Sequence, residues 1–451
     1  MTDLLIIGSG PGGYQAAAYA ARHGLSVTVV EESEAGGTCL NRGCIPTKSL
    51  CHDAEHPSDF AAAMARKEAV VAQLRSGVEQ LMQMPGITFV RGRGVLQPDG
   101  SVHVVNPAGN GLPPVRLEGA NILVATGSHA KMPPIAGIGL PGVMTSTELL
   151  SVDHVPERLC VVGAGVVGLE LAGIFSAYGS QVTVVEFMKE CLPQMDADLA
   201  KRLRKQMERR GIAFHMSAAV QRIEQGSDGS LSVVFEKKGR DDAVQADVVL
   251  VATGRAANIE GLAVPETLSA LGIRTDRRGI VVDPDTFECR SPEDVDGATS
   301  LPRLFAIGDV NGLQMLAHAA EAQAHRVVDH ILGRPDTRRF DVMPAAVFTV
   351  PELACVGATE EQLKAEGRPF AVHKATFRAN GRALCIGQTE GLVKLITDPD
   401  DRLIAAHALG PQAASLVQEA TAYIQLGATL RQLRETVHIH PTLSEVLVEA
   451  M

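Results

Sequence analysis

A glycine pattern that occurs twice, 155 residues apart, constrains the fold of this chain more than any other feature of its sequence. Each pattern follows an apolar strand-like segment and precedes an apolar helix-like segment, and each is closed by a second apolar run that ends in Glu31 or Glu186. The pattern consists of Gly8, Gly10 and Gly13, and then of Gly163, Gly165 and Gly168. This order predicts two units of strand, glycine turn, helix and strand.

Such a unit has a known physical logic. The first glycine permits a tight turn, the second lets the backbone approach a pyrophosphate, and the third lets the helix pack closely on the strand. The helix N-terminus then faces the negative charge, and the acid after the second strand can accept hydrogen bonds from ribose hydroxyls. One glycine pattern is weak evidence. Two patterns in full context predict two dinucleotide sites.

Further repeats predict the fold class. Both units carry a later Val-Ala-Thr-Gly segment, which ends at Gly127 and at Gly254, and another apolar run ends at Asp309. Beyond Met343 the pattern changes to short strands and helices. We therefore predict an α/β protein with two Rossmann-like dinucleotide-binding domains and a C-terminal α+β domain. The expected segments are 1–148 for the first part of the first domain, 149–270 for the second domain, 271–338 for the return to the first, and 339–451 for the last.

Charge and hydropathy narrow the choice of partners. A formal net charge of -11 argues against nucleic acid or an anionic membrane as the main partner. No apolar run approaches the ~18 residues of a transmembrane helix. The first strand begins at Leu4, which leaves no room for a signal peptide, so a cytoplasmic location is expected.

The eight cysteines fall into two groups. Six are scattered among apolar neighbours, as expected of small buried side chains: Cys51, Cys160, Cys191, Cys289, Cys355 and Cys385. None has metal-ligand spacing, so no metal site is expected. Cys39 and Cys44 stand five residues apart after the first unit, a span that one distorted helical turn can close into a disulfide. The spacing alone leaves two interpretations open: the cysteines are a redox pair, or they are unrelated to each other.

The segment from Gly36 to Lys48 resembles the active-site signature of the pyridine nucleotide–disulfide oxidoreductases. The resemblance extends over essentially the whole chain, including both glycine patterns and the tail from His438 to Glu445. It is strongest to the dihydrolipoamide dehydrogenases of class I. This implies an enzyme that oxidises protein-bound dihydrolipoyl groups with NAD, through FAD and a redox-active disulfide. The open alternative is a related reductase acting on glutathione, on another small disulfide or on a metal such as mercury.

The resemblance also implies residue roles around FAD. Cys44 would face the flavin, Cys39 would meet the substrate, and Lys48 would lie by the flavin, paired with Glu170 at the start of the second unit's helix. Asp309 would bind the ribityl chain. The remaining FAD residues implied are Gly8, Gly10, Gly13, Glu31, Thr38, Gly94, Thr126, Gly127, Ser128, Met315, Leu316, Ala317 and His318.

The second glycine pattern would hold the nicotinamide nucleotide. A carboxylate at Glu186 suits the free 2′-hydroxyl of NAD and repels the extra phosphate of NADP. Val166 stands where relatives that reduce glutathione carry a tyrosine, which also favours the dehydrogenase. The NAD residues implied are Gly163, Gly165, Val166, Gly168, Glu186, Val220 and Gly254.

Thiol oxidation near neutral pH needs a proton acceptor, and histidine suits this role. A carboxylate on the other ring nitrogen fixes the tautomer and stabilises the imidazolium. His440 and Glu445 resemble that dyad, whereas His438 has the wrong neighbours for it and is expected to be structural. In the family the dyad completes the active site of the other subunit. The resemblance therefore implies a homodimer, with a lipoyl-bearing protein of a 2-oxo acid dehydrogenase complex or the glycine cleavage system as partner.

Overall fold

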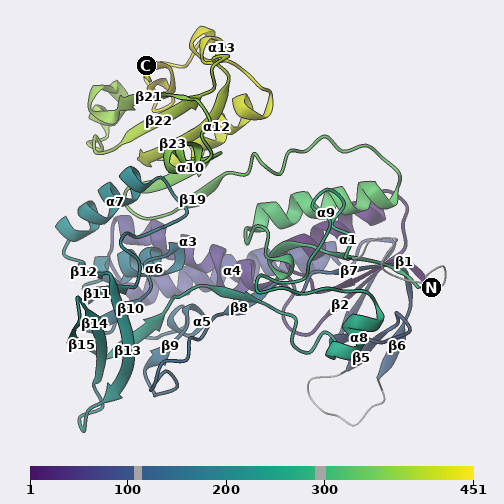
Figure 1. The fold of residues 1–451 in the computed structure, drawn as a ribbon. Helices are drawn as coiled ribbons and strands as arrows, with labels where there is room; N and C mark the ends of the chain where they lie inside the picture. The colour runs from purple at the N-terminus through teal and green to yellow at the C-terminus, as the bar shows by residue number, and fades with distance from the viewer. Residues whose placement is uncertain (106–113, 290–300, 451) are drawn as a thin grey trace. The chain divides into compact units, whose positions relative to one another are not determined.

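The computed structural model describes residues 1–105, 114–289 and 301–450, and these divide into two compact units (Figure 1). Unit 1 comprises Met1–Ser49, Ala65–Lys131 and Arg255–Arg338. Unit 2 comprises Leu50–Met64, Met132–Gly254 and Arg339–Met451. These two units are defined by contacts between residues of the chain. They do not test the bounds of the four segments expected from the sequence, which stay predictions.

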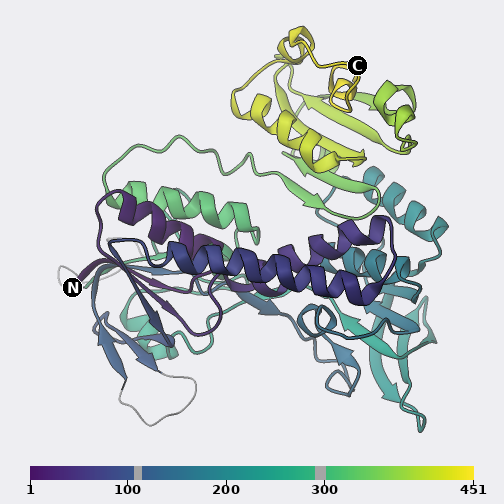
Figure 2. The same ribbon diagram turned by 180° about the vertical axis from the view of Figure 1, so that it is seen from behind.

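Unit 1 is built on a five-stranded parallel sheet in the order β18-β7-β1-β2-β3. The strands are β1 (Thr2–Ile7), β2 (Val27–Glu31), β3 (Ile87–Arg91), β7 (Gly119–Val124) and β18 (Arg303–Ala306). The apolar residues of β1 are almost fully buried, as expected for the centre of a parallel sheet. Helices α1 (Pro11–Arg22) and α9 (Ala317–Ile331) lie side by side (Figure 2). The predicted strand–helix–strand order of the first repeat is confirmed.

The remaining elements of unit 1 surround this sheet. Strands β8 (Ser128–Ala130) and β17 (Arg255–Ala257) form a separate antiparallel pair. The other elements are β4 (Arg93–Leu96), β5 (Val102–Val105), β6 (Val115–Leu117), α2 (Gly37–Arg42), α8 (Pro265–Ala270) and the 3₁₀ turn η3 (Gly308–Asn311). Helices α3 (Cys44–Glu55) and α4 (Phe60–Leu81) each have one part in unit 1 and one part in unit 2.

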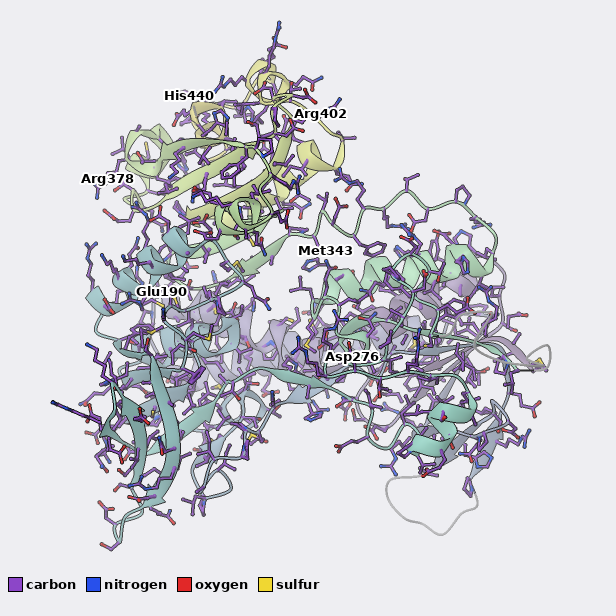
Figure 3. The ribbon with its side chains drawn as sticks, in the orientation of Figure 1. Glu190, Asp276, Met343, Arg378, Arg402 and His440 are labelled. Carbon is purple, nitrogen blue, oxygen red and sulfur yellow. The ribbon has the colours of Figure 1, made fainter. Side chains whose placement is uncertain are left out.

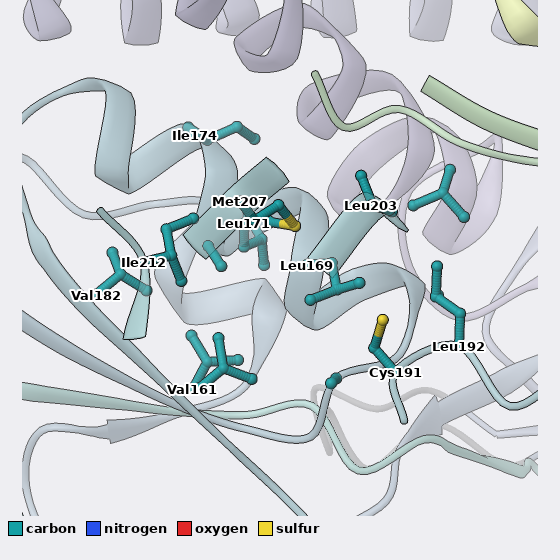
Figure 4. Close-up of a cluster of buried hydrophobic side chains, with 14 of the residues drawn as sticks. Val161, Leu169, Leu171, Ile174, Val182, Cys191, Leu192, Leu203, Met207 and Ile212 are labelled. Carbon is teal, nitrogen blue, oxygen red and sulfur yellow. The ribbon is translucent and has the colours of Figure 1, made fainter. Parts of the chain in front are cut away.

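Unit 2 repeats the plan of unit 1 in a parallel sheet of order β12-β11-β10-β16-β9. Its elements are β9 (Val143–Met144), α5 (Ser146–Leu149), β10 (Arg158–Val162), α6 (Val166–Ala177), β11 (Gln181–Glu186), α7 (Ala197–Arg209), β12 (Ala213–Met216) and β16 (Val248–Val251). An antiparallel sheet of β13 (Ala218–Gln225), β14 (Leu231–Lys237) and β15 (Arg240–Ala246) follows α7 and β12. Leu169 of α6 and Leu203 of α7 belong to the buried core (Figure 4). The second predicted repeat is therefore confirmed.

The C-terminal part of unit 2 is an antiparallel sheet in the order β19-β20-β23-β22-β21. Its elements are β19 (Ala345–Val347), β20 (Glu352–Val356), α10 (Glu360–Ala365), β21 (Ala371–Thr376), η4 (Phe377–Ala379), α11 (Gly381–Cys385), β22 (Leu392–Thr397), β23 (Leu403–Gly410), α12 (Ala413–Gln425), α13 (Leu430–Glu435) and α14 (Glu445–Glu449). A fully buried ion pair of 2.7 Å joins Lys394 on β22 to Asp196 at the start of α7. Within the described residues, no helix is long and apolar enough to cross a membrane.

Candidate active site

The first glycine of each turn is required by the backbone. Gly8 and Gly163 have φ angles of 101° and 108°, which side chains other than glycine rarely adopt. A Cβ atom on Gly8 would lie 2.4 Å from the carbonyl oxygen of Ala125, and one on Gly163 would lie 2.5 Å from that of Ala252. In both units, therefore, the turn sits against the Ala-Thr-Gly segment that ends a neighbouring strand.

The other glycines divide between packing and access. A Cβ atom on Gly13 or Gly168 would lie 2.0 or 2.2 Å from the carbonyl oxygen of the first glycine, so no side chain fits between helix and turn. In contrast, a Cβ atom on Gly165 would meet nothing within 4 Å, and one on Gly10 would meet a single atom at 4.0 Å. The middle glycine thus keeps backbone accessible at the start of each helix, as the sequence pattern predicts.

Glu31 and Glu186 close the two turns in the same way. Both are buried, with relative exposures of 7% and 8%, and each accepts two backbone hydrogen bonds. The donors are the N–H groups of Ser9 (2.7 Å) and Ser33 (2.8 Å) for Glu31, and of Ala164 (2.5 Å) and Met188 (2.7 Å) for Glu186. The donors, like the acceptors, are 155 residues apart, so the repeat in the sequence is matched by the same hydrogen bonds in both turns. Each acid shapes its turn, a role that the sequence pattern does not show.

The two turns fit the pyrophosphate of a dinucleotide. Helix α1 follows Gly10 and helix α6 follows Gly165, and neither N-cap makes a side-chain hydrogen bond. The first N–H groups of a helix have no partner within the helix and carry partial positive charge. A phosphate group at these positions would accept hydrogen bonds from them without displacing a side-chain cap.

Cys39 and Cys44 lie together beside the first turn, both as thiols. Cys39 belongs to α2 and Cys44 begins α3, so the pair does not share one distorted helical turn. The break falls at Gly43, where a Cβ atom would lie 3.0 Å from the carbonyl oxygen of Thr38. Cys39 is half-buried and Cys44 is exposed. The hydrogen bond with Cys44, and then burial, raise the pKa of the Cys39 thiol, while the charge of Lys48 opposes this rise.

Tyr14 lies near Cys39, and Glu321 lies near Tyr14, two residues that sequence reasoning missed. Glu321 of α9 and Cys39 both act electrostatically on Tyr14 of α1. Burial, then the negative charge of Glu321, raise the pKa of Tyr14 to about 12. Glu321 also interacts with His318. Tyr14 directly follows the third glycine, but no spacing rule connects it to a helix some 300 residues away.

The other predicted FAD residues lie in unit 1. Ser128 Oγ donates a hydrogen bond to Asp309 Oδ2, which joins the end of the first Ala-Thr-Gly segment to η3. Gly308, before Asp309, donates its N–H to Gln323 of α9 (2.7 Å). The remaining predicted residues lie in α2 (Thr38), in β4 (Gly94), after β7 (Thr126 and Gly127), before α9 (Met315 and Leu316) and in its first turn (Ala317 and His318).

The predicted NAD residues lie in unit 2. Val166 is the first residue of α6, Val220 lies in β13, and Gly254 follows β16. Glu170 lies in the second turn of α6 and not at its start, because the helix begins at Val166. Its carboxylate is buried and accepts a hydrogen bond from the backbone N–H of Phe348 (2.9 Å). Its pairing with Lys48 stays a prediction.

The predicted dyad is formed in the C-terminal part of unit 2; Figure 3 labels His440 there. His440 Nδ1 lies 2.8 Å from Glu445 Oε1, and Glu445 Oε2 accepts the backbone N–H of Thr442 at 2.8 Å. The Thr442 bond, then the His440 bond, lower the pKa of Glu445, so this carboxylate is ionised at neutral pH. The His440 side chain is 78% exposed. Nδ1 of His440 is thus engaged by Glu445, and Nε2 is the other nitrogen of this exposed ring.

His438 has a carboxylate partner that the sequence did not reveal. Its Nε2 lies 2.7 Å from Glu419 Oε1, and its Nδ1 lies 2.9 Å from the carbonyl oxygen of Thr436. Its side chain is 8% exposed. The expectation that it has no suitable neighbour is wrong, because Glu419 comes from α12. Both ring nitrogens are engaged, however, which agrees with a structural role.

Across residues 1–105, 114–289 and 301–450, no cluster of three or more His, Cys, Asp or Glu side chains could hold a metal ion. The two glycine turns favour organic cofactors. Two turns of matched shape can each hold a dinucleotide, and a thiol pair beside one of them can exchange electrons with a disulfide. The fold and the site therefore define a dinucleotide-dependent disulfide oxidoreductase.

Comparisons with known proteins give the family. The family described as "Pyridine nucleotide-disulphide oxidoreductase" matches residues 2–324 of this chain. The dimerisation domain of the same family matches residues 343–451. The chain belongs to the pyridine nucleotide-disulphide oxidoreductase family.

Individual relatives match over nearly the full length. Dihydrolipoyl dehydrogenase 3 of Pseudomonas putida is 38% identical, over 99% of this chain and 97% of its own. Mitochondrial dihydrolipoyl dehydrogenase 1 of Arabidopsis thaliana is 37% identical, over 99% and 89%. Among solved structures, the HOCl-induced flavoprotein disulfide reductase RclA of Escherichia coli superposes with a TM-score of 0.87 at 30% identity, over 99% of both chains.

Proposed function

We propose that this chain is an NAD-dependent dihydrolipoyl dehydrogenase that holds FAD at the first glycine turn and NAD at the second. One observation carries the proposal: the Cys39–Cys44 pair and the His440–Glu445 dyad occur together in a chain that is 36–38% identical to dihydrolipoyl dehydrogenases over nearly its full length. Bound FAD would take electrons from the cysteine pair and pass them to NAD.

The reaction at the cysteines is thiol–disulfide exchange. With Cys39 and Cys44 joined as a disulfide, one dihydrolipoyl thiolate attacks the Cys39 sulfur, and Cys44 leaves as a thiolate. The second dihydrolipoyl thiolate then attacks the mixed disulfide, closes the lipoyl ring and releases Cys39. Two protons leave the substrate and two electrons enter the cysteine pair.

His440 serves as the acceptor of the thiol protons. Its Nδ1 is held by an ionised Glu445, which fixes the ring and stabilises the positive charge that forms on proton uptake. The match to a dimerisation domain supports a homodimer. In the proposed dimer, each dyad acts on the cysteines of the other subunit. A lipoyl-bearing protein of a 2-oxo acid dehydrogenase complex or of the glycine cleavage system, and a cytoplasmic location, belong to the same proposal.

Steady-state rates test the function directly. With dihydrolipoamide and NAD, kcat/KM should exceed that with glutathione disulfide and NADPH, because Glu186 closes the second turn and Val166 stands at the start of α6. The similarity to a flavoprotein disulfide reductase keeps a small-disulfide reductase as the second candidate. Faster turnover with the second substrate pair would select that candidate.

Glu186 should set the choice of nucleotide. Glu186→Ser combined with Met188→Arg removes a ribose hydrogen bond and the repulsion of a 2′-phosphate. A buried polar contact contributes ~1–3 kcal/mol, so the ratio of kcat/KM for NAD over NADP should fall by roughly one to two decades.

A control is needed because Glu186 also holds the Ala164 and Met188 N–H groups. Glu31→Ser breaks the same two kinds of backbone bond in the first turn. It should leave the NAD/NADP ratio unchanged. An unaltered ratio in the Glu186 variant would show that this acid does not contact the ribose.

A further inference from the structure

Arg255 occupies a particular place along the chain. It is the first residue of the segment that returns to unit 1, and it begins β17. Strand β17 pairs with β8, the last element of unit 1 before the chain passes to Met132. The short β8–β17 ribbon therefore joins the outgoing and returning segments directly beside η3.

The side chain of Arg255 donates two hydrogen bonds to Ser128. Its Nε donates to the Ser128 hydroxyl at 2.6 Å, and its Nη2 donates to the Ser128 carbonyl oxygen at 2.7 Å. Ser128 is almost fully buried, with a relative exposure of 5%. Since the hydroxyl accepts from Arg255, its own proton is directed to Asp309 Oδ2. Arg255 Nε itself lies 3.8 Å from the same carboxylate oxygen.

The hydrogen bonds from Arg255 to Ser128 and from Ser128 to Asp309 engage one carboxylate oxygen of Asp309 and leave the other available. Within the described part of the chain, Asp309 Oδ2 takes the Ser128 bond, whereas Oδ1 makes no hydrogen bond. The Asp309 side chain is 24% exposed, and Oδ1 is the oxygen that is left to accept a bond from a ligand hydroxyl. Hydrogen bonds in series from a cation to an anion polarise one another, which stiffens the carboxylate that they hold.

We propose that Arg255 is a positioning residue for the flavin cofactor: acting through Ser128, it fixes the Asp309 carboxylate so that Oδ1 accepts a hydroxyl of the flavin's ribityl chain. This rests on the proposed function, which places FAD in unit 1. Lysine cannot replace Arg255 fully, because one ammonium group cannot supply the fork that reaches both the hydroxyl and the carbonyl oxygen.

Binding of FAD and of ADP to protein freed of flavin separates this role from general damage. ADP shares the adenosine and pyrophosphate of FAD but lacks the ribityl chain. In Arg255→Gln, FAD affinity should fall roughly 10-fold, as expected for a lost charge-assisted hydrogen bond, while ADP affinity should stay as in the wild type. Ser128→Ala should give a similar loss, and Arg255→Lys a smaller one.

A double-variant cycle shows whether Arg255 acts through Asp309. In an Asp309→Asn background, Arg255→Gln should add little further loss of FAD affinity, because the carboxylate that it positions is already gone. His129→Ala is the matched control. It removes a 2.6 Å contact with Asn258 in the same ribbon without touching Asp309, so FAD and ADP should bind as in the wild type.

Three results would overturn the inference: unchanged FAD affinity in Arg255→Gln, a parallel fall in ADP affinity, or full additivity with Asp309→Asn. If Arg255→Gln does not fold, Ser128→Ala decides in its place. A wild-type protein that binds ADP but no FAD would instead overturn the proposed function, and this inference with it.

Discussion

Cys44→Ser should abolish the oxidation of dihydrolipoamide while leaving FAD bound. A serine hydroxyl cannot form the disulfide that accepts the substrate's electrons, so no residual exchange pathway remains. Cys39→Ser should be equally inactive for the same reason. Turnover of dihydrolipoamide with NAD by each variant measures the loss.

The two variants should nevertheless differ in their spectra. If Cys44 faces the flavin, Cys39→Ser should show the long-wavelength charge-transfer absorption of a thiolate beside oxidised flavin without any added reductant, and Cys44→Ser should not. Cys51 lies in α3, seven positions after Cys44, and Cys51→Ser is the control that should stay active. Identical spectra for the two active-site variants would refute the separate roles.

The thiol geometry already distinguishes the two sulfurs. The hydrogen bond with Cys44, and then burial, raise the pKa of the Cys39 thiol, so loss of the proton from Cys39 is disfavoured. The positive charge of Lys48 acts in the opposite direction. The spectral prediction requires the two thiols to differ in this way.

The sequence was a good guide wherever the constraint is local. Gly8 and Gly163 could be identified because a tight turn against a neighbouring strand leaves no space for a Cβ atom. The flanking strands could be identified because strands buried on both faces are continuous apolar runs. The His440–Glu445 pair is also local, since its members are five positions apart in the sequence.

The sequence was a poor guide wherever the partner comes from a distant element. Glu419 reaches His438 from α12, and Glu321 reaches Tyr14 from α9. Arg255 reaches Ser128 only because β8 and β17 pair across 127 residues of chain. No spacing rule encodes such contacts, because the intervening fold sets them.

Replacing His440 with glutamine should nearly abolish dihydrolipoamide oxidation, because general-base help contributes ~10²–10⁴-fold. FAD should stay bound, since its proposed contacts lie in unit 1. Glu445→Gln should cost less, because this residue orients the ring and does not carry the proton. His438→Gln is the matched control: its ring already uses both nitrogens within the fold, so the loss of activity should be far smaller.

The same variant can show which subunit supplies the base. If each dyad serves the partner's cysteines, mixing His440→Gln chains with Cys44→Ser chains gives heterodimers in which one of the two sites has both an intact cysteine pair and an intact histidine. The mixture of the two inactive variants should then regain part of the wild-type rate. The fraction of chains that form heterodimers sets the upper limit of this recovery. Subunit exchange must be confirmed independently, for example by differential tagging and mass measurement. A mixture that exchanges subunits and stays inactive would place His440 at its own subunit's cysteines, because each heterodimer would then hold one site without a base and one without a disulfide.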